Sequence, residues 1–196
     1  MANYVSLTDV KVYGDFVISE TTDDDLLQDL IDRAEDIVEG LTSRQFAVSG
    51  ITARQFDAVE DIDGLYLYFD EDCAEVTSVL NGDGETLTTE HYVVEPRNET
   101  PIYALKIKAN SNKYWTYDTD PENAITVSGY WGYSKVPSED IKHAVIRLVS
   151  WIYRQRESSV DLDRPLLTGD GTIVMPTRLP ADILSIISKY KKLRIK

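Results

Sequence analysis

The feature that most constrains the fold is a change of sequence pattern between residues 124 and 152. Residues 124–130 alternate in the manner of a strand, and Val136-Pro137 follows shortly after them. Apolar residues then recur at spacings of three and four, which places them on one face of an α-helix. These residues are Ile141, Ala144, Val145, Leu148, Val149 and Ile152. Because Pro137 suits a first helical turn, the sequence predicts a strand followed closely by a long amphipathic helix.

Two further helices are predicted in the first 45 residues. Ser6 and Asp9 resemble a capping box with Asp in place of Glu, and Gly14 ends this short helix. The next helix follows Thr22-Asp-Asp-Asp25, and we expect the three aspartates to cap it. Its apolar face carries Leu26, Leu27, Leu30, Ile31, Ala34, Ile37, Val38 and Leu41. Its opposite, polar face carries Asp29, Asp32, Arg33, Glu35, Asp36 and Glu39.

The middle of the chain has the pattern of a small antiparallel sheet. Strand-like runs are separated by turn signals such as Asp63-Gly64 and Asn81-Gly-Asp-Gly84. The runs cover residues 52–56, 65–69, 75–80, 92–95, 103–108 and 124–130. Leu179-Pro180 then opens a last helix, whose apolar residues continue to Leu193. The predicted fold class is therefore α+β, with helical ends and a β-rich middle.

Charge and composition exclude several classes of protein. The net charge is −14, and the acidic excess lies in residues 1–100, whereas basic residues are in slight excess after residue 100. A chain with this balance is a poor candidate for sequence-independent DNA binding, which needs a basic surface. No apolar run is long enough to span a bilayer, and the N-terminus lacks a signal-peptide pattern. With a single cysteine, Cys73, the chain forms no intrachain disulfide, which favours a reducing compartment.

We find no convincing catalytic, cofactor or metal site. The two histidines, His91 and His143, accompany no nucleophile motif, and Cys73 follows Asp70-Glu-Asp72, which predicts a raised thiol pKa. The segment Asp61-Ile-Asp63-Gly64 resembles part of a calcium loop, but Val59 occupies the position of the first carboxylate ligand. Loose calcium binding by the acidic cluster remains an alternative. That cluster is Asp57, Glu60, Asp61 and Asp63.

Two other groups of residues have more than one interpretation. An aromatic set is suited to core packing or to an interface patch. A third interpretation is a stacking platform for bases or sugars, although the set has fewer basic neighbours than nucleic-acid platforms usually have. Its members are Tyr114, Trp115, Tyr117, Tyr130, Trp131 and Tyr133. Residues 157–178 lack helical periodicity and fit either a hairpin around Thr168-Gly-Asp-Gly171 or a mobile loop.

Four groups of stretches, in this order and spacing, resemble one protein family. They are Leu7-Thr-Asp-Val-Lys-Val-Tyr13 with Thr22-Asp-Asp-Asp-Leu-Leu27 and Glu39-Gly-Leu-Thr-Ser-Arg-Gln-Phe46; Ala74-Glu-Val-Thr-Ser-Val79 with Leu87-Thr-Thr-Glu-His-Tyr-Val-Val94; Ile125-Thr-Val-Ser-Gly-Tyr-Trp-Gly-Tyr133 with Val136-Pro137; and Leu179-Pro-Ala-Asp-Ile183 with Lys189-Tyr-Lys-Lys-Leu-Arg194. The family is that of the head–tail connector, or head-completion adaptor, proteins of tailed bacteriophages. The resemblance covers most of the chain.

The resemblance implies a helical core interrupted by an inserted small antiparallel β domain. The N-terminal part of the core would be residues 1–51, the β-rich insert residues 52–134, and the long helix, extended loop and C-terminal helix residues 135–196. It also implies a structural, non-enzymatic virion protein without a cofactor, made in the host cytoplasm and located in the neck. Such a protein forms a homo-oligomeric ring, usually a dodecamer, between the portal protein and the tail or stopper protein. DNA passes through the ring without being specifically bound.

Two sets of residues become candidate sites on this interpretation. We expect the basic C-terminal helix to contact the portal through Lys189, Tyr190, Lys191, Lys192, Leu193 and Arg194. We expect the loop around Leu166, Leu167, Ile173 and Val174 to become ordered between neighbouring subunits. Another neck or tail-completion protein, a carboxylate-based hydrolase and a generic acidic interaction module remain the alternatives. Stopper and tail-completion proteins tend to be mainly β, which the predicted helices argue against.

Overall fold

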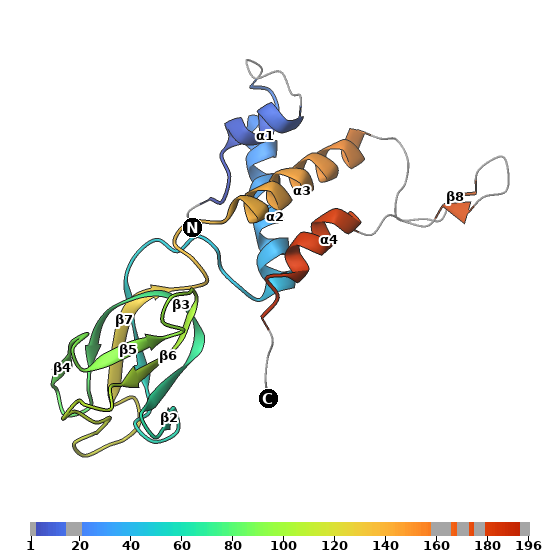
Figure 1. Cartoon of the computed structure of the whole chain (residues 1–196). Coiled ribbons are helices and arrows are strands. Elements are labelled where there is room, and N and C mark those ends of the chain that lie inside the picture. Colours follow the sequence, from blue (N-terminus) through green and yellow to red (C-terminus); the bar gives the residue numbers. More distant parts are fainter. Residues whose placement is uncertain (1–2, 15–20, 158–165, 168–172, 175–178, 193–196) are drawn as a thin grey trace. The chain divides into compact units, whose positions relative to one another are not determined.

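The computed structural model of the chain describes residues 3–14, 21–157, 166–167, 173–174 and 179–192. The chain divides into two compact units (Figure 1). The helical unit comprises residues 3–44 and 137–196, and the β unit comprises residues 45–136. Helices and an antiparallel sheet therefore occupy different parts of the sequence, and the α+β fold class is confirmed.

The helical unit contains α1 (Leu7–Gly14), α2 (Asp24–Thr42), α3 (Glu139–Glu157) and α4 (Ala181–Ser188). Helix α2 packs against all three others, and α3 also packs against α1 and α4. The predicted apolar face of the long helix is the buried face of α3, with Ile141, Val145 and Leu148 completely inaccessible. Each such side chain contributes roughly 1.5–3 kcal/mol by leaving water.

The ends of α1 and α2 are capped differently. At α1 the predicted capping box is present, because the Ser6 N–H donates to Asp9 Oδ2 at 3.0 Å and the Asp9 N–H donates to Ser6 Oγ at 3.1 Å. At α2 the expected aspartate cap is wrong: Asp23 occupies the N-cap position but makes no side-chain cap bond. Its carboxylate instead accepts the Tyr153 hydroxyl at 2.7 Å, and Asp24 pairs with Lys11. The tertiary partners of α2 thus take the groups that local sequence assigns to capping.

The β unit contains seven strands in one sheet. They are β1 (Thr52–Phe56), β2 (Ile62–Asp63), β3 (Tyr66–Leu80), β4 (Thr86–Leu87), β5 (Tyr92–Glu95), β6 (Ile102–Ile107) and β7 (Ile125–Trp131). The order is β1-β7-β3-β6-β5, β2 and β4 also pair with β3, and every pairing is antiparallel. Residues buried along β7 alternate with partly exposed ones, as a strand with one face on a core requires.

Strand β3 is longer than the sequence pattern predicts. The runs 65–69 and 75–80, predicted as separate strands, belong to one strand that continues through the acidic residues between them. Register shifts between Tyr68 and Cys73, and again between Val76 and Ser78, take up these residues without ending the strand. The first part of β3 pairs with β6 and the second part with β7, so pairing on two sides carries the strand through the acidic residues.

The core of the β unit is apolar and aromatic. Phe56, Leu67, Val127 and Trp131 are buried together, and the Trp131 indole N–H donates to the Thr52 carbonyl at 3.0 Å. Two further two-residue strands, β8 (Leu166–Leu167) and β9 (Ile173–Val174), pair with each other in antiparallel register. Among the described residues, none of the helices has the length and apolar character needed to cross a bilayer.

Candidate functional site

The basic residues predicted to bind a partner follow α4 instead of lying within a helix. The prediction of a helix through Leu193 is wrong, because α4 ends at Ser188. The physical reason is a contact with another helix: the Lys192 N–H donates to the carbonyl of Thr42, at the end of α2, at 2.8 Å. The chain therefore leaves the helical path and is held against α2.

Only part of this basic segment faces solvent freely. Lys189 is largely exposed, with its Nζ 3.6 Å from Asp140 Oδ2, and Lys191 is exposed without an ion pair to any described residue. Tyr190, in contrast, has its hydroxyl 3.1 Å from Ser138 Oγ. Leu193 and Arg194 lie outside the described residues. Lys189 and Lys191 are thus the side chains of the predicted set that are best placed to meet a partner.

The second predicted site, around Leu166, Leu167, Ile173 and Val174, has a defined backbone arrangement. Leu166 pairs with Val174 and Leu167 with Ile173 across the β8–β9 ladder. This is the arrangement expected of the hairpin interpretation. The role of this segment in contacts between subunits stays a prediction.

A buried carboxyl on α2 is a feature that the sequence pattern missed. Glu35 was predicted on the polar face, but it is only 8% exposed and accepts the Tyr4 N–H at 2.6 Å through Oε1. Glu39 accepts the Tyr4 hydroxyl, so one tyrosine contacts two glutamates of α2. Burial raises the pKa of Glu35 from 4.5 to about 7. The sequence signal that was available is the residue's position beside Ile31 and Val38 on the helix.

The helical unit also has a small pocket with basic and aromatic walls. Its volume is about 270 Å³. It is lined by Tyr13 of α1 and by Arg147, Ser150, Trp151, Arg154 and Gln155 of α3. Arg147 pairs with Asp182 of α4 at 2.7 Å, and the ring of Tyr13 meets His143 edge-on at 5.6 Å. The hydroxyl of Ser150 is buried and has no hydrogen-bond partner among the described residues. The pocket therefore offers a cationic, aromatic surface with an unused polar group.

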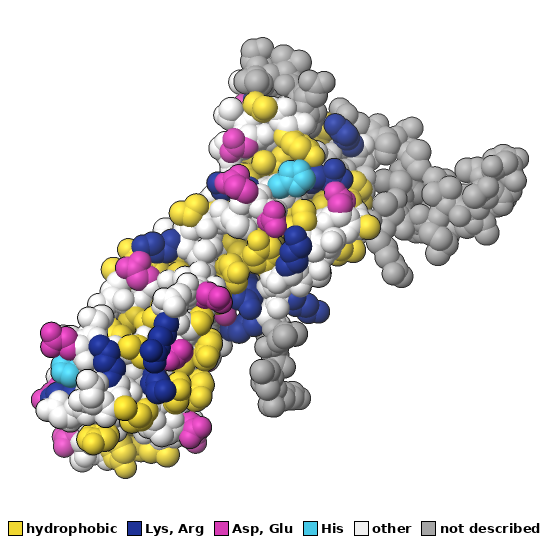
Figure 2. Space-filling view, viewed as in Figure 1, with side chains coloured by type: hydrophobic (Ala, Val, Ile, Leu, Met, Phe, Trp, Pro, Cys, Tyr) yellow, Lys and Arg dark blue, Asp and Glu magenta, His cyan; other side chains and the backbone are white. Residues whose placement is uncertain are grey.

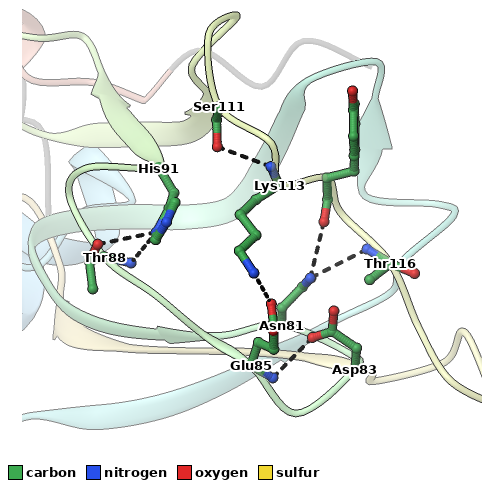
Figure 3. Close-up of polar contacts among 9 residues, drawn as sticks. Asn81, Asp83, Glu85, Thr88, His91, Ser111, Lys113 and Thr116 are labelled. Atoms are coloured by element: carbon green, nitrogen blue, oxygen red, sulfur yellow. Dashed lines mark hydrogen bonds and ion pairs between the residues drawn. The ribbon is translucent and has the colours of Figure 1, made fainter.

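A polar network in the β unit has a structural explanation (Figure 3). The amide of Asn81, which is 2% exposed, donates to the Tyr114 carbonyl at 3.0 Å and accepts the Thr116 N–H at 3.3 Å. Lys113 forms an ion pair with Glu85 in the same network. These contacts hold residues 113–116 against the turn that follows β3.

The other residues singled out by sequence also have structural partners. Cys73 is completely buried, and this burial raises its thiol pKa to about 11; the direction agrees with the prediction, but the acidic neighbours are not the main cause. His91 Nδ1 lies 3.1 Å from both the N–H and the hydroxyl of Thr88. In the acidic cluster considered for loose calcium binding, Asp61 Oδ2 accepts the Asp57 N–H at 2.8 Å. Within the described part of the chain, no three His, Cys, Asp or Glu residues are grouped to hold a metal ion.

The predicted aromatic set is divided between core and surface. Trp131 is buried, and Trp115 packs against the same core while its indole N–H donates to the Leu65 carbonyl at 2.8 Å. Tyr114, by contrast, is 67% exposed. On the face seen in Figure 2, acidic and basic side chains are interspersed with hydrophobic ones, and neither charge forms one continuous field.

The whole-chain fold resembles solved structures of phage-like particles. No family model and no curated protein matches the chain. A structure described as the virion of the native gene transfer agent (GTA) particle matches with a TM-score of 0.57 and 14% identity, over 98% of this chain and 92% of the other. The neck of the empty GTA particle, computed with C6 symmetry, matches with a TM-score of 0.55 and 12% identity over the same shares of both chains. The neck of the native GTA particle, computed with C12 symmetry, matches with a TM-score of 0.52 and 14% identity, over 100% of this chain and 97% of the other.

Proposed function

We propose that this chain is a structural protein of the neck of a phage-like virion, where it forms the adaptor ring between head and tail. The observation that carries the proposal is the extent of the structural likeness, which covers 98% of this chain and 92% of a chain from a particle neck. A likeness of that extent includes both the helical unit and the β unit. It goes beyond the sharing of one common supersecondary motif.

The proposed assembly is a ring. The similar neck structures were computed with sixfold and twelvefold symmetry, which a ring of repeated subunits satisfies. In this assembly the portal protein lies on one side, the stopper or tail protein lies on the other, and DNA passes through the centre. A net charge of −14 suits a conduit, because acidic walls repel phosphate and do not grip the passing duplex.

We assign the portal contact to the exposed cations that follow α4. Lys189 and Lys191 face solvent, whereas Lys192 is tied to α2 through its backbone. Lys189→Glu with Lys191→Glu should therefore abolish docking on the portal while the monomer stays folded. The matched control, Arg97→Glu with Lys108→Glu in the β unit, changes the net charge equally and should dock normally. Normal docking by the Lys189/Lys191 variant would refute this assignment.

We further propose that the β8–β9 segment lies between neighbouring subunits in the ring. Proteolysis within residues 158–178 should then be slower in assembled rings than in the free chain. Equal cleavage rates at equal subunit concentration would contradict this role. Circular dichroism of both samples would check that the rest of the fold is the same.

The decisive experiment is electron microscopy of the purified chain mixed with portal-bearing, DNA-filled heads from the same source. Additional ring density beneath the portal is the expected result, and its orientation would identify the docking face. Density at another level of the neck would favour a different completion protein. Absence of density well above micromolar concentration would refute the neck proposal and favour a generic interaction module.

A further inference from the structure

Helix α2 presents a regular row of carboxylates to solvent. Asp25, Asp29, Asp32 and Asp36 are all exposed and follow one another at i, i+4, i+7 and i+11. This spacing keeps them on one face of the helix, opposite the buried Leu27, Ile31 and Val38 face. None of the four forms an ion pair with a described residue, and Asp32 accepts one hydrogen bond, from Gln28 at 3.1 Å. We call these four residues the acidic row.

Helix α3 carries a row with the same spacing, in which Arg147 and Arg154 are the cations. His143, Arg147, Ser150 and Arg154 also follow one another at i, i+4, i+7 and i+11. We call these four residues the basic row, and three of them line the pocket together with Tyr13 and Trp151. Arg154 is exposed and has no ion pair with a described residue, while Arg147 forms an ion pair with Asp182.

The two arginines of the basic row match two carboxylates of the acidic row in spacing and are opposite to them in charge. Residues seven positions apart on a helix are separated by about 10.5 Å along its axis. Arg147 and Arg154 therefore have the same separation as Asp29 and Asp36. The pattern i, i+4, i+7, i+11 reads the same in both directions, so it fits a parallel or an antiparallel pairing of the two helices.

The buried Ser150 hydroxyl in the basic row also indicates a carboxylate ligand. Ser150 is 5% exposed, and its Oγ has no partner among the described residues. An unpaired buried hydroxyl is costly, and it is normally retained where a partner satisfies it. A carboxylate is an acceptor that suits both this hydroxyl and the flanking arginines. Ser150 lines the same pocket as Arg154 and Gln155.

We infer that neighbouring copies of this chain join through these rows, with the acidic row of one copy docking on the basic row of the next. This inference rests on the proposed ring function. Because the two rows are different surfaces of one subunit, the contact is heterologous, which is the type that generates rings when the rotation closes. The basic pocket thus binds aspartate side chains of a second copy.

Charge reversal on each row, and then on both, tests the inference. Asp29→Lys with Asp36→Lys should weaken ring formation about tenfold or more, because it places cations opposite Arg147 and Arg154. Arg147→Glu with Arg154→Glu should do the same. The chain with all four substitutions keeps the wild-type net charge and restores opposite charges across the contact, so its ring formation should recover. If loss of the Arg147–Asp182 pair unfolds the double variant, Arg154→Glu alone replaces it, because this single substitution keeps that pair.

A neutral substitution separates assembly from folding. Ser150→Ala removes an unpaired buried hydroxyl, so the free chain should be as stable as the wild type or more stable. Ring formation should nevertheless weaken several-fold, which a purely structural role of Ser150 would not produce. Unchanged ring formation in this variant would overturn the role given to the hydroxyl.

Ring formation would be measured on portal-bearing heads by electron microscopy and in solution by sedimentation velocity, with circular dichroism confirming the fold. If the wild type assembles and the reversed variants assemble equally well, the contact between rows is refuted while the neck function stands. Failure of the four-substitution chain to recover, with its fold intact, would also refute the contact. If the wild type forms no ring on heads at any concentration, the proposed function itself fails.

Discussion

The buried carboxyl of Glu35 predicts a pH dependence of stability that one substitution should remove. Glu35 is 8% exposed, and its pKa rises from 4.5 to about 7 on folding. The main cause is burial, which penalises the ionised form, and the charges of Asp32 and Glu39 add to it. The Tyr4 N–H donor opposes the rise without cancelling it.

The sign of this pH dependence follows from which state, folded or unfolded, binds the Glu35 proton more tightly. Because the folded state holds the Glu35 proton more strongly, the stabilisation is complete below pH 4.5 and is lost as the pH rises through about 7. A change in pKa of this size corresponds to at most about 3 kcal/mol, of which roughly 2.5 kcal/mol falls between pH 5 and pH 8. Glu35→Gln keeps an oxygen acceptor for the Tyr4 N–H but carries no charge. It should therefore gain up to that amount relative to the wild type over this interval.

The measurement is urea unfolding at pH 5 and at pH 8, followed by circular dichroism at a wavelength dominated by the helices. The quantity of interest is the difference in unfolding free energy between Glu35→Gln and the wild type, because other titrating groups cancel in it. Asp36→Asn, on the exposed face of the same helix, is the matched control and should show no comparable change with pH. A Glu35→Gln difference that stays constant between the two pH values would refute the reasoning.

Three further predictions concern other parts of the structure. Gly129→Ala should destabilise the β unit by about 2–4 kcal/mol, because a Cβ at this position meets the Glu75 carbonyl. Gly40→Ala in α2 is the matched control: its Cβ meets open space, so it should stabilise the helical unit by about 0.5–1 kcal/mol. Thermal unfolding of both variants measures the two effects. Ser6→Ala removes the α1 capping box and should cost about 1 kcal/mol in the same assay. Cys73, whose thiol pKa is raised to about 11 by burial, should react with a thiol reagent at pH 8 only after denaturant is added; rapid labelling of the native chain would contradict its burial.

The sequence alone was sufficient where short-range pattern decides the structure. Helical periodicity identified the buried face of α3, because residues three and four apart lie on one side of any helix. The Ser6–Asp9 capping box was predictable, because all of its bonds close within one turn. The bounds of β1 and β5 also agree with the predicted runs, since each is one short run of strand-like residues.

Only the tertiary structure decided features that depend on residues far apart in sequence. Strand β3 passes through its acidic residues because β6 and β7 pair with different parts of it. Helix α4 ends at Ser188 because the Lys192 N–H meets the end of α2, which leaves Lys189 and Lys191 as the exposed cations. Glu35 is buried because Tyr4, 31 residues earlier, folds over α2 and donates to its carboxylate. In each case a partner far away in the sequence decides the local structure, and such a partner leaves no periodic signal along the chain.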